Sequence, residues 1–181
     1  MKEPYTYPEF NKNSLVFEIG GYQGDGMRKM YEQYKCDIYV FEPIKEYYDA
    51  ITKDVKAFNF GLSDTTRTAR INVAKDGSSL HYVITDKFID IELICIKDFI
   101  HQENIKHVDL MNVNTEGEEY NLLPYMIKEG LMPIFDYVQI QFHDATPDCV
   151  VKRDNIHKGL SLTHTLSWSL DFIWELWEKK I

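Results

Sequence analysis

Two glutamates and a cluster of glycines near the start of the sequence have the types and spacing of a nucleotide-cofactor site. Glu18 lies near the end of the short apolar run Leu15–Ile19, and several glycines follow within Gly20–Gly24. Such a run is typical of a buried parallel strand, and the glycines permit a tight turn that approaches a ligand closely. Glu42 lies about twenty residues further on, where a carboxylate can accept hydrogen bonds from ribose hydroxyls. The pattern predicts a cofactor pocket.

The glycine spacing distinguishes between two classes of nucleotide cofactor. A dinucleotide site needs the spacing Gly-x-Gly-x-x-Gly, and no frame of Gly20, Gly21, Gly24 and Gly26 supplies it. A nicotinamide-dependent oxidoreductase is therefore the weaker alternative. S-adenosylmethionine instead carries an ammonium and a sulfonium, whose positive charges a carboxylate at Glu18 complements.

Further motifs occur in a fixed order along the chain, and together with the first one they resemble the FkbM-type methyltransferases. The resemblance extends from about Leu15 to Asp144. A single glycine turn would be weak evidence, but several ordered motifs with matching gaps are specific. The matching motifs are Phe17–Gly21, Phe41–Pro43, Asn59–Asp64, Gly77–Leu80 and Val108–Glu119.

The resemblance implies a Rossmann-like class I methyltransferase fold that binds S-adenosylmethionine. It also implies transfer of a methyl group to a hydroxyl of a sugar, a glycan or a small metabolite. The residues that it assigns to the methionine portion are Glu18, Gly20, Gly21, Tyr22 and Gly24, with Glu42 for the ribose and Gly61, Leu62 and Ser63 for the adenine. Ser78 and Ser79 are further candidates for contact, although their composition alone is typical of a hairpin turn.

One motif departs from the family pattern. Where the family has Lys-Ile-Asp-x-Glu-Gly, this chain has Asn112, Asn114 and then Glu116-Gly117. Both charged positions have become amides, which removes a cation and a candidate general base. Either another group supports catalysis, or the domain is a binding module that has lost activity.

The remaining candidates for catalysis follow from the chemistry of a hydroxyl acceptor, which needs help to lose its proton. Glu116 and His143 are the candidate general bases, and Asn114 is a candidate for positioning the cofactor amine or the substrate. Each base has a structural alternative. Glu116 could instead cap the following helix, and a single histidine at a strand end is often a packed residue.

Periodicity predicts the elements that must position these residues: a mostly parallel sheet with helices on both faces and an inserted antiparallel hairpin. The site residues then share the carboxyl edge of the sheet. Pro147–Lys158 is interpreted as a polar bridge, and the tail with Trp168, Trp174 and Trp177 as either buried or a platform for a sugar ring. The predicted strands are Leu15–Ile19, Tyr39–Phe41, Lys56–Phe60, Val108–Asn114 and Tyr137–His143. The hairpin spans Arg67–Thr85 with Ile91–Ile96 as its extension, and the helices follow Gly26, Pro43, Lys97 and Gly117.

Bulk properties exclude several other classes. A chain of 181 residues fits one domain, and a net charge of −9 without a Lys/Arg-rich run argues against a nucleic-acid partner. The three scattered cysteines predict free thiols in the cytoplasm, and no apolar run or signal-like start indicates a membrane. His157 and His164, with His143 and Asp144, match no metal-site spacing, so no metal ligands are assigned and a divalent cation is an outside alternative.

Overall fold

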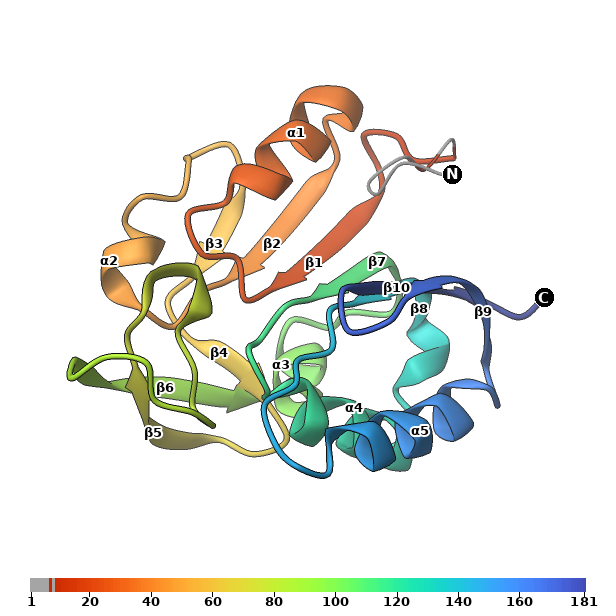
Figure 1. Ribbon diagram of the computed structural model, residues 1–181. Helices are drawn as coiled ribbons and strands as arrows, with labels where there is room; N and C mark the ends of the chain where they lie inside the picture. Colours follow the sequence, from red (N-terminus) through yellow and green to blue (C-terminus); the bar gives the residue numbers. More distant parts are fainter. Residues whose placement is uncertain (1–6, 8) are drawn as a thin grey trace.

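The computed structural model describes Tyr7 and residues 9–181, and its centre is the predicted mostly parallel sheet (Figure 1). The strand order is β3-β2-β1-β7-β8-β10-β9, with parallel pairing from β3 to β8 and antiparallel pairing of β10 with both of its neighbours. This order confirms the Rossmann-like methyltransferase fold. The strands are β1 (Leu15–Ile19), β2 (Asp37–Phe41), β3 (Lys56–Phe58), β7 (Val108–Val113), β8 (Phe135–Ile140), β9 (His164–Leu170) and β10 (Trp174–Lys179).

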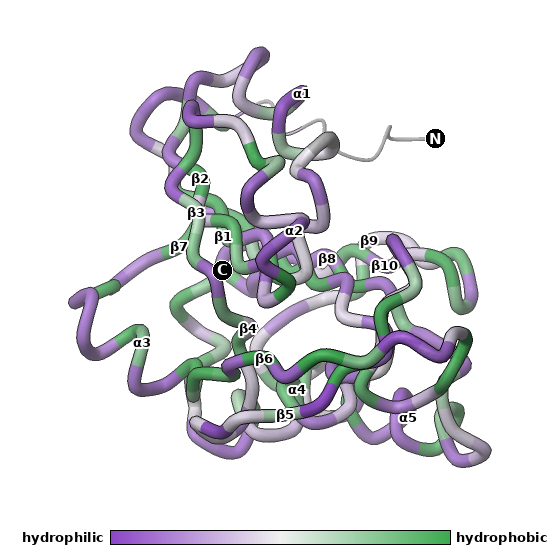
Figure 2. The backbone as a smooth tube through the Cα atoms, turned by 90° about the vertical axis from the view of Figure 1, so that its left-hand side faces the viewer, coloured by the Kyte–Doolittle hydropathy of each residue, from purple (hydrophilic) through white to green (hydrophobic). Residues whose placement is uncertain are grey.

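Helices cover both faces of this sheet, as predicted (Figures 1 and 2). Helix α1 (Asp25–Tyr34) packs Met27 and Met30 on one face, against Val16 of β1. The other face is covered by α3 (Ile96–Gln102), α4 (Glu119–Lys128) and α5 (Cys149–Leu160). Because side chains alternate along a strand, β1 supplies Phe17 and Ile19 to the core on that face and Val16 to the α1 core.

The predicted hairpin is part of a second, three-stranded sheet. It contains β4 (Gly61–Ser63), β5 (Arg67–Asn72) and β6 (Phe88–Cys95), in the order β4-β6-β5. Within Arg67–Thr85 the antiparallel pairing is limited to a bridge between Asn72 and Ser79. The main partner of β5 is β6, which covers most of the Ile91–Ile96 segment predicted to extend the hairpin. The buried side chain of Asn72 holds the intervening chain: it donates to the carbonyls of Thr85 and Lys87 and accepts from the amide of Ile84. This segment includes the short helix η1 (Lys75–Gly77).

Three other segments differ from the sequence-based expectation. The polar bridge over Pro147–Lys158 is wrong, since α5 occupies most of it. That helix buries only Cys149, Ile156 and Leu160. Too few apolar residues therefore recur at helical spacing for the helix to be recognised from the sequence. The tryptophan-rich tail forms the antiparallel pair β9 and β10. Strand β8 ends at Ile140, so His143 lies in the loop that follows the strand.

Two short helical segments complete the fold. Helix α2 (Lys45–Tyr48) packs Ile44 and Tyr47 against the second sheet, and η2 (Met132–Ile134) leads into β8. All three cysteines are buried free thiols, as predicted. Among the described residues, no helix combines the length and the apolar composition needed to cross a membrane.

Candidate functional site

A cavity of about 250 Å³ lies at the carboxyl ends of β1, β2 and β7, next to the inserted sheet. Open α/β sheets bind ligands at this edge, where neighbouring connections leave the sheet in opposite directions. Most of the residues proposed from the sequence line the cavity: Glu18, Gly20, Gly21, Tyr22, Glu42, Gly61, Leu62, Asn114 and Glu116. Gly24, Ser63 and His143 are not among the lining residues.

The glycine turn after β1 fits between two strands with no room for a side chain. Gly20 has a φ of +85°, and a Cβ added to it would lie 1.8 Å from the backbone oxygen of Asn114. The amide of Gly20 donates to the carbonyl of Phe41, at 3.1 Å, and the amide of Asn114 donates to Ile19, at 2.9 Å. Only glycine can occupy this position without moving the strands apart. Gly24 has a different role, since it precedes α1 and faces Ile51.

Glu18 is a buried acid with one polar partner. Its carboxyl group is supplied by β1, the residue is 7% exposed, and Asn112 Nδ2 donates to its Oε2 at 2.7 Å. Burial raises the pKa of Glu18 to about 8, and the hydrogen bond from Asn112 only partly opposes that shift. No lysine or arginine forms an ion pair with it among the described residues. The carboxyl group is therefore poised to take a cationic partner from the cavity.

Glu42 occupies the end of the next strand and is fixed by backbone amides. Its Oε2 accepts from Tyr22 N at 2.9 Å, and its Oε1 accepts from Ile44 N at 2.8 Å. Burial raises the pKa of Glu42 to about 7, and the two amide hydrogen bonds act in the opposite direction. Asn59 donates to the carbonyls of Glu42 and Pro43, at 3.1 Å each. The Glu42 carboxyl group is thus held in one orientation at the cavity.

The loop after β7 presents Glu116 to the same cavity in a strained conformation. Glu116 has a φ of +52°, in the left-handed region that favours glycine. The Tyr82 hydroxyl donates to Glu116 Oε2, and Ser79 Oγ donates to the backbone oxygen of Glu116 at 2.6 Å. Its carboxylate therefore contacts the inserted segment and does not cap α4. Burial opposes ionisation, but contacts from His143 and Tyr82 outweigh it and lower the pKa of Glu116.

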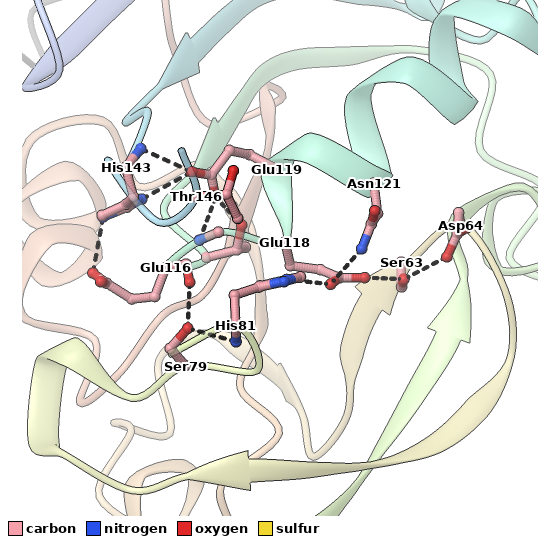
Figure 3. Close-up of polar contacts among 12 residues, drawn as sticks. Ser63, Asp64, Ser79, His81, Glu116, Glu118, Glu119, Asn121, His143 and Thr146 are labelled. Atoms are coloured by element: carbon pink, nitrogen blue, oxygen red, sulfur yellow. Dashed lines mark hydrogen bonds and ion pairs between the residues drawn. The ribbon is translucent and has the colours of Figure 1, made fainter. Parts of the chain in front are cut away.

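His143 lies between two carboxylates and outside the cavity lining (Figure 3). Its Nδ1 is 3.0 Å from Glu119 Oε1, and its Nε2 is 2.9 Å from Glu116 Oε1. Burial disfavours the imidazolium, yet the hydrogen bonds to Glu116 and Glu119 outweigh burial and raise the pKa of His143 to about 9. A protonated ring cannot accept a proton, so the geometry favours Glu116 over His143 as the proton acceptor.

A second polar network ties the inserted sheet to the start of α4. Glu118 is buried and accepts from Ser63 Oγ and from Asn121 at 3.0 Å, while His81 Nε2 lies 2.9 Å from it (Figure 3). Arg67 also donates to Glu118, at 2.9 Å. Burial raises the pKa of Glu118, but these partners reverse the shift and lower it to about 2. Ser63 is therefore placed against Glu118, on the far side of the cavity wall.

Two cavity residues of the inserted segment, Lys75 and Asp76, had no assigned role from the sequence. The same segment contributes Ser78 and Leu80 from the Gly77–Leu80 motif, and β10 contributes Trp174. Ser78 does form a turn, since its hydroxyl donates to the carbonyl of Lys75 at 2.6 Å, and it also lines the cavity. Long-range packing brings these residues together, and the sequence signals for them were the Gly77–Leu80 motif and the tryptophan-rich tail.

The other histidines do not assemble into a metal site at the cavity. His157 pairs with Glu175 at 2.8 Å, and His164 Nε2 is 3.0 Å from the carbonyl of Phe135. Within the described part of the chain, one other group has suitable ligand types: His107, Asp109 and Asp136. It lies near the starts of β7 and β8, at the opposite end of the strands, and Lys179 also pairs with Asp136.

Comparison with solved structures shows that this fold is similar to that of methyltransferases. No protein-family model matches the sequence, and no curated protein matches it either. The structure is similar to the crystal structure of a fibrillarin/Nop5p complex, with a TM-score of 0.59 and 9% identity over 97% of this chain and 77% of that chain. The chain has the Rossmann-like methyltransferase fold.

Two further structures have the same fold and overlap with more than nine tenths of this chain. An rRNA methylase from Streptococcus thermophilus has a TM-score of 0.51 and 11% identity, over 95% of this chain and 90% of that chain. An SAH-bound methyltransferase from Podospora anserina has a TM-score of 0.52 and 12% identity, over 93% of this chain and 72% of that chain. Identities this low establish the fold alone.

Proposed function

We propose that this protein is an S-adenosylmethionine-dependent methyltransferase of the FkbM type. One observation carries the proposal: the carboxyl groups of Glu18 and Glu42, from adjacent parallel strands, face a single cavity beside a glycine turn. Glu42 is placed to accept hydrogen bonds from the ribose, and Glu18 complements the positive charge at the methionine end. Leu62 supplies apolar surface for the adenine.

The residues of the cavity fit this cofactor better than a dinucleotide. Its acidic lining residues include Glu18, Glu42, Glu116 and Glu118, against a single basic one, Lys75. A pyrophosphate would be repelled by this excess of carboxyl groups, whereas a sulfonium and an ammonium are attracted to it. When bound, S-adenosylmethionine supplies a methyl group already activated by the sulfonium.

For the acceptor, we propose a hydroxyl of a sugar, a glycan or a small metabolite. Glu116 is the group that receives the hydroxyl proton as the new O–C bond forms. The His143 imidazolium and the Tyr82 hydroxyl each contact one oxygen of Glu116, so they hold the carboxylate in place. Asn114 lines the same part of the cavity and can position the acceptor without accepting its proton.

The proposed setting is the cytoplasm, where the three buried thiols would stay reduced. Some proteins with this fold are rRNA methylases, but a net charge of −9 is a poor match for a phosphate backbone. A small or glycan acceptor is the better fit to that charge.

A second candidate function is a binding module that retains the cofactor without turnover. It is favoured by Asn112 and Asn114, which are neutral at the two positions where the FkbM-type pattern has charged residues. Release of S-adenosylhomocysteine in the presence of hydroxyl acceptors distinguishes the two, because the module would bind the cofactor and release no product.

The decisive experiment is a calorimetric titration of the protein with S-adenosylhomocysteine and, separately, with NAD⁺. We expect binding of the first compound and none of the second. Glu42→Ala should weaken the affinity by about 1–3 kcal/mol, the usual cost of losing a charged hydrogen-bond partner. Glu46→Ala is the matched control, since this acid is 70% exposed on α2 and outside the cavity.

Two results would contradict the assignment. A folded Glu42→Ala protein with unchanged affinity would remove the ribose role of Glu42. Tighter binding of NAD⁺ than of S-adenosylhomocysteine would favour the oxidoreductase alternative instead.

A further inference from the structure

Glu119, the first residue of α4, joins the two loops that carry Glu116 and His143 (Figure 3). Its side chain is 0% exposed, and both of its carboxylate oxygens are hydrogen-bonded. Oε2 accepts from Thr115 Oγ1 at 2.9 Å and from the amide of Gly117 at 2.8 Å. Oε1 accepts from the amide of His143 at 2.9 Å and lies 3.0 Å from its Nδ1. Since a carboxylate offers about four acceptor positions, these partners use its full capacity.

The loop after β7 has a backbone conformation that depends on outside contacts. Glu116 has a φ of +52°, and Gly117 has a φ of +110°. A residue with a side chain keeps a positive φ only where its surroundings hold it there. Ser79 Oγ holds the carbonyl oxygen of Glu116, and Glu119 holds the amide of Gly117. Together they fix the direction in which the Glu116 side chain leaves the loop.

His143 is fixed at its backbone and at its ring. Glu119 accepts from its amide and contacts its Nδ1, and the Tyr120 hydroxyl donates to its carbonyl oxygen at 2.7 Å. Because Nδ1 faces Glu119, Nε2 faces Glu116, at 2.9 Å from its Oε1. One buried carboxylate therefore sets the positions of both members of the Glu116–His143 pair.

The two acids that contact the ring of His143 differ in their access to a ligand. Glu116 lines the cavity and its side chain is 16% exposed, whereas Glu119 is outside the lining and fully buried. Glu116 is thus the acid that can exchange a proton with a ligand, and Glu119 keeps its charge behind the ring. The other titratable or charged groups packed around this part of the loop are Tyr82 from the inserted segment, Tyr120 from α4, Asp144 from the same loop, and Cys149 and Arg153 from α5.

Transfer of a proton to Glu116 changes the charge of one acid and leaves the other unchanged. As the O–C bond to the acceptor forms and the S–C bond of the cofactor breaks, the hydroxyl proton passes to Glu116, and the cofactor product is a neutral thioether. Glu116 is then neutral, and Glu119 remains as the counter-ion of the His143 imidazolium. The proton passes from Glu116 to water when the product leaves.

We propose that Glu119 is a positioning residue for the proposed reaction, which orients Glu116 and His143 together and keeps His143 charged while Glu116 is neutral. This inference rests on the proposed function and adds to it a residue outside the cavity. In the sequence, Glu119 ends the Val108–Glu119 motif, where it had no assigned role.

A nuclear magnetic resonance titration of the histidine Cε1–H signals tests the charge. Glu116→Gln imitates the neutral state of Glu116, so that Glu119 is the acid left to oppose the effect of burial on the ring. The pKa of His143 in this variant should fall from about 9 but stay above the ordinary value of 6.5. The signal of His143 is assigned by its absence in His143→Gln.

Hydrogen exchange of the backbone amides tests the positioning. In Glu119→Gln the amides of Gly117 and His143 lose a charged acceptor, so both should exchange at least ~10-fold faster than in the wild-type protein. Glu118→Gln is the matched control, since this neighbouring acid is 3% exposed and has its partners on the inserted sheet and on α4. It should change neither the two exchange rates nor the pKa of His143.

The outcomes separate the role of Glu119 from the proposed function. A pKa of His143 at or below 6.5 in Glu116→Gln would overturn the role, and this result decides alone if Glu119→Gln does not fold. Unchanged exchange of both amides in a folded Glu119→Gln protein would overturn it as well. Calorimetry should show that Glu119→Gln binds S-adenosylhomocysteine within about twofold of the wild-type affinity, because Glu119 does not line the cavity. Failure of the wild-type protein to bind this compound would instead overturn the proposed function.

Discussion

At the scale of single residues, the acids of the site have pKa values shifted in two opposite directions. Burial without a cation raises the pKa of Glu18 and of Glu42, to about 8 and about 7. Hydrogen-bond donors outweigh burial at Glu116 and Glu118, and their pKa values are lowered. Pairs of acids with divergent pKa values are typical of sites with separate binding and proton-transfer roles. The first pair suits cation binding, and Glu116 suits proton acceptance.

His143 should make a stability contribution that depends on pH. Its pKa is about 9 in the folded protein, against an ordinary histidine value of 6.5 in the unfolded chain, so the contribution is complete below pH 6.5 and disappears as the pH rises through 9. The shift corresponds to about 3 kcal/mol. We expect His143→Gln to lower the free energy of unfolding by roughly that amount at pH 6 and by much less at pH 10.

Denaturant unfolding of both proteins at several pH values measures this difference. His101→Gln is the control, because His101 is exposed in the last turn of α3. A loss in His143→Gln that stays constant between pH 6 and pH 10 would show that the ring is not held as an imidazolium.

At the scale of elements, local pattern predicted the strands that carry the site. β1 and β7 are apolar runs buried on both faces, a pattern that does not depend on distant residues. Ile91–Ile96 was predicted only as an extension of the hairpin, and its place as the main partner of β5 could not be predicted because it lies beyond a long segment held by Asn72. Helix α5 buries too few apolar side chains to show a period.

In the site, too, some residues could be predicted from local pattern and others depend on long-range packing. Glu18 lies one residue before the end of β1, and Glu42 and Glu116 follow the ends of β2 and β7. The topology of the sheet brings such positions to one edge. Tyr82 and Trp174 reach the site from a loop and from the last strand, through packing that no local motif encodes. The protonation of His143 likewise depends on two carboxylates that only the fold brings together.

The turn between β1 and α1 should tolerate no side chain at Gly20. Gly20→Ala should lower the free energy of unfolding by about 2–4 kcal/mol, because its Cβ would overlap the backbone of Asn114, directly after β7. Gly130→Ala isolates the conformational part of that cost: its φ is +67°, and nothing lies within 4 Å of the added Cβ. We expect only about 1 kcal/mol there. Equal denaturation midpoints for the two variants would contradict the steric explanation.

At the scale of the whole molecule, the cavity is assembled from nearly the full length of the chain. Its lining begins at Glu18 in β1 and ends at Trp174 in β10. The inserted sheet supplies another wall and is tied to the loop after β7 through the contacts of Glu116 and Glu118. Cofactor binding should therefore change the surroundings of residues from both the early and the late part of the sequence.

Trp174 offers a direct readout of this arrangement, since it is the tryptophan among the cavity residues. Addition of S-adenosylhomocysteine should change the tryptophan fluorescence by displacing water from the indole. Trp174→Phe should abolish most of that change, whereas Trp168→Phe, which removes an indole packed beside the α1 core, should preserve it. Calorimetry must show that both variants still bind the compound. A signal that survives in Trp174→Phe and disappears in Trp168→Phe would place the ligand beside Trp168, away from the cavity.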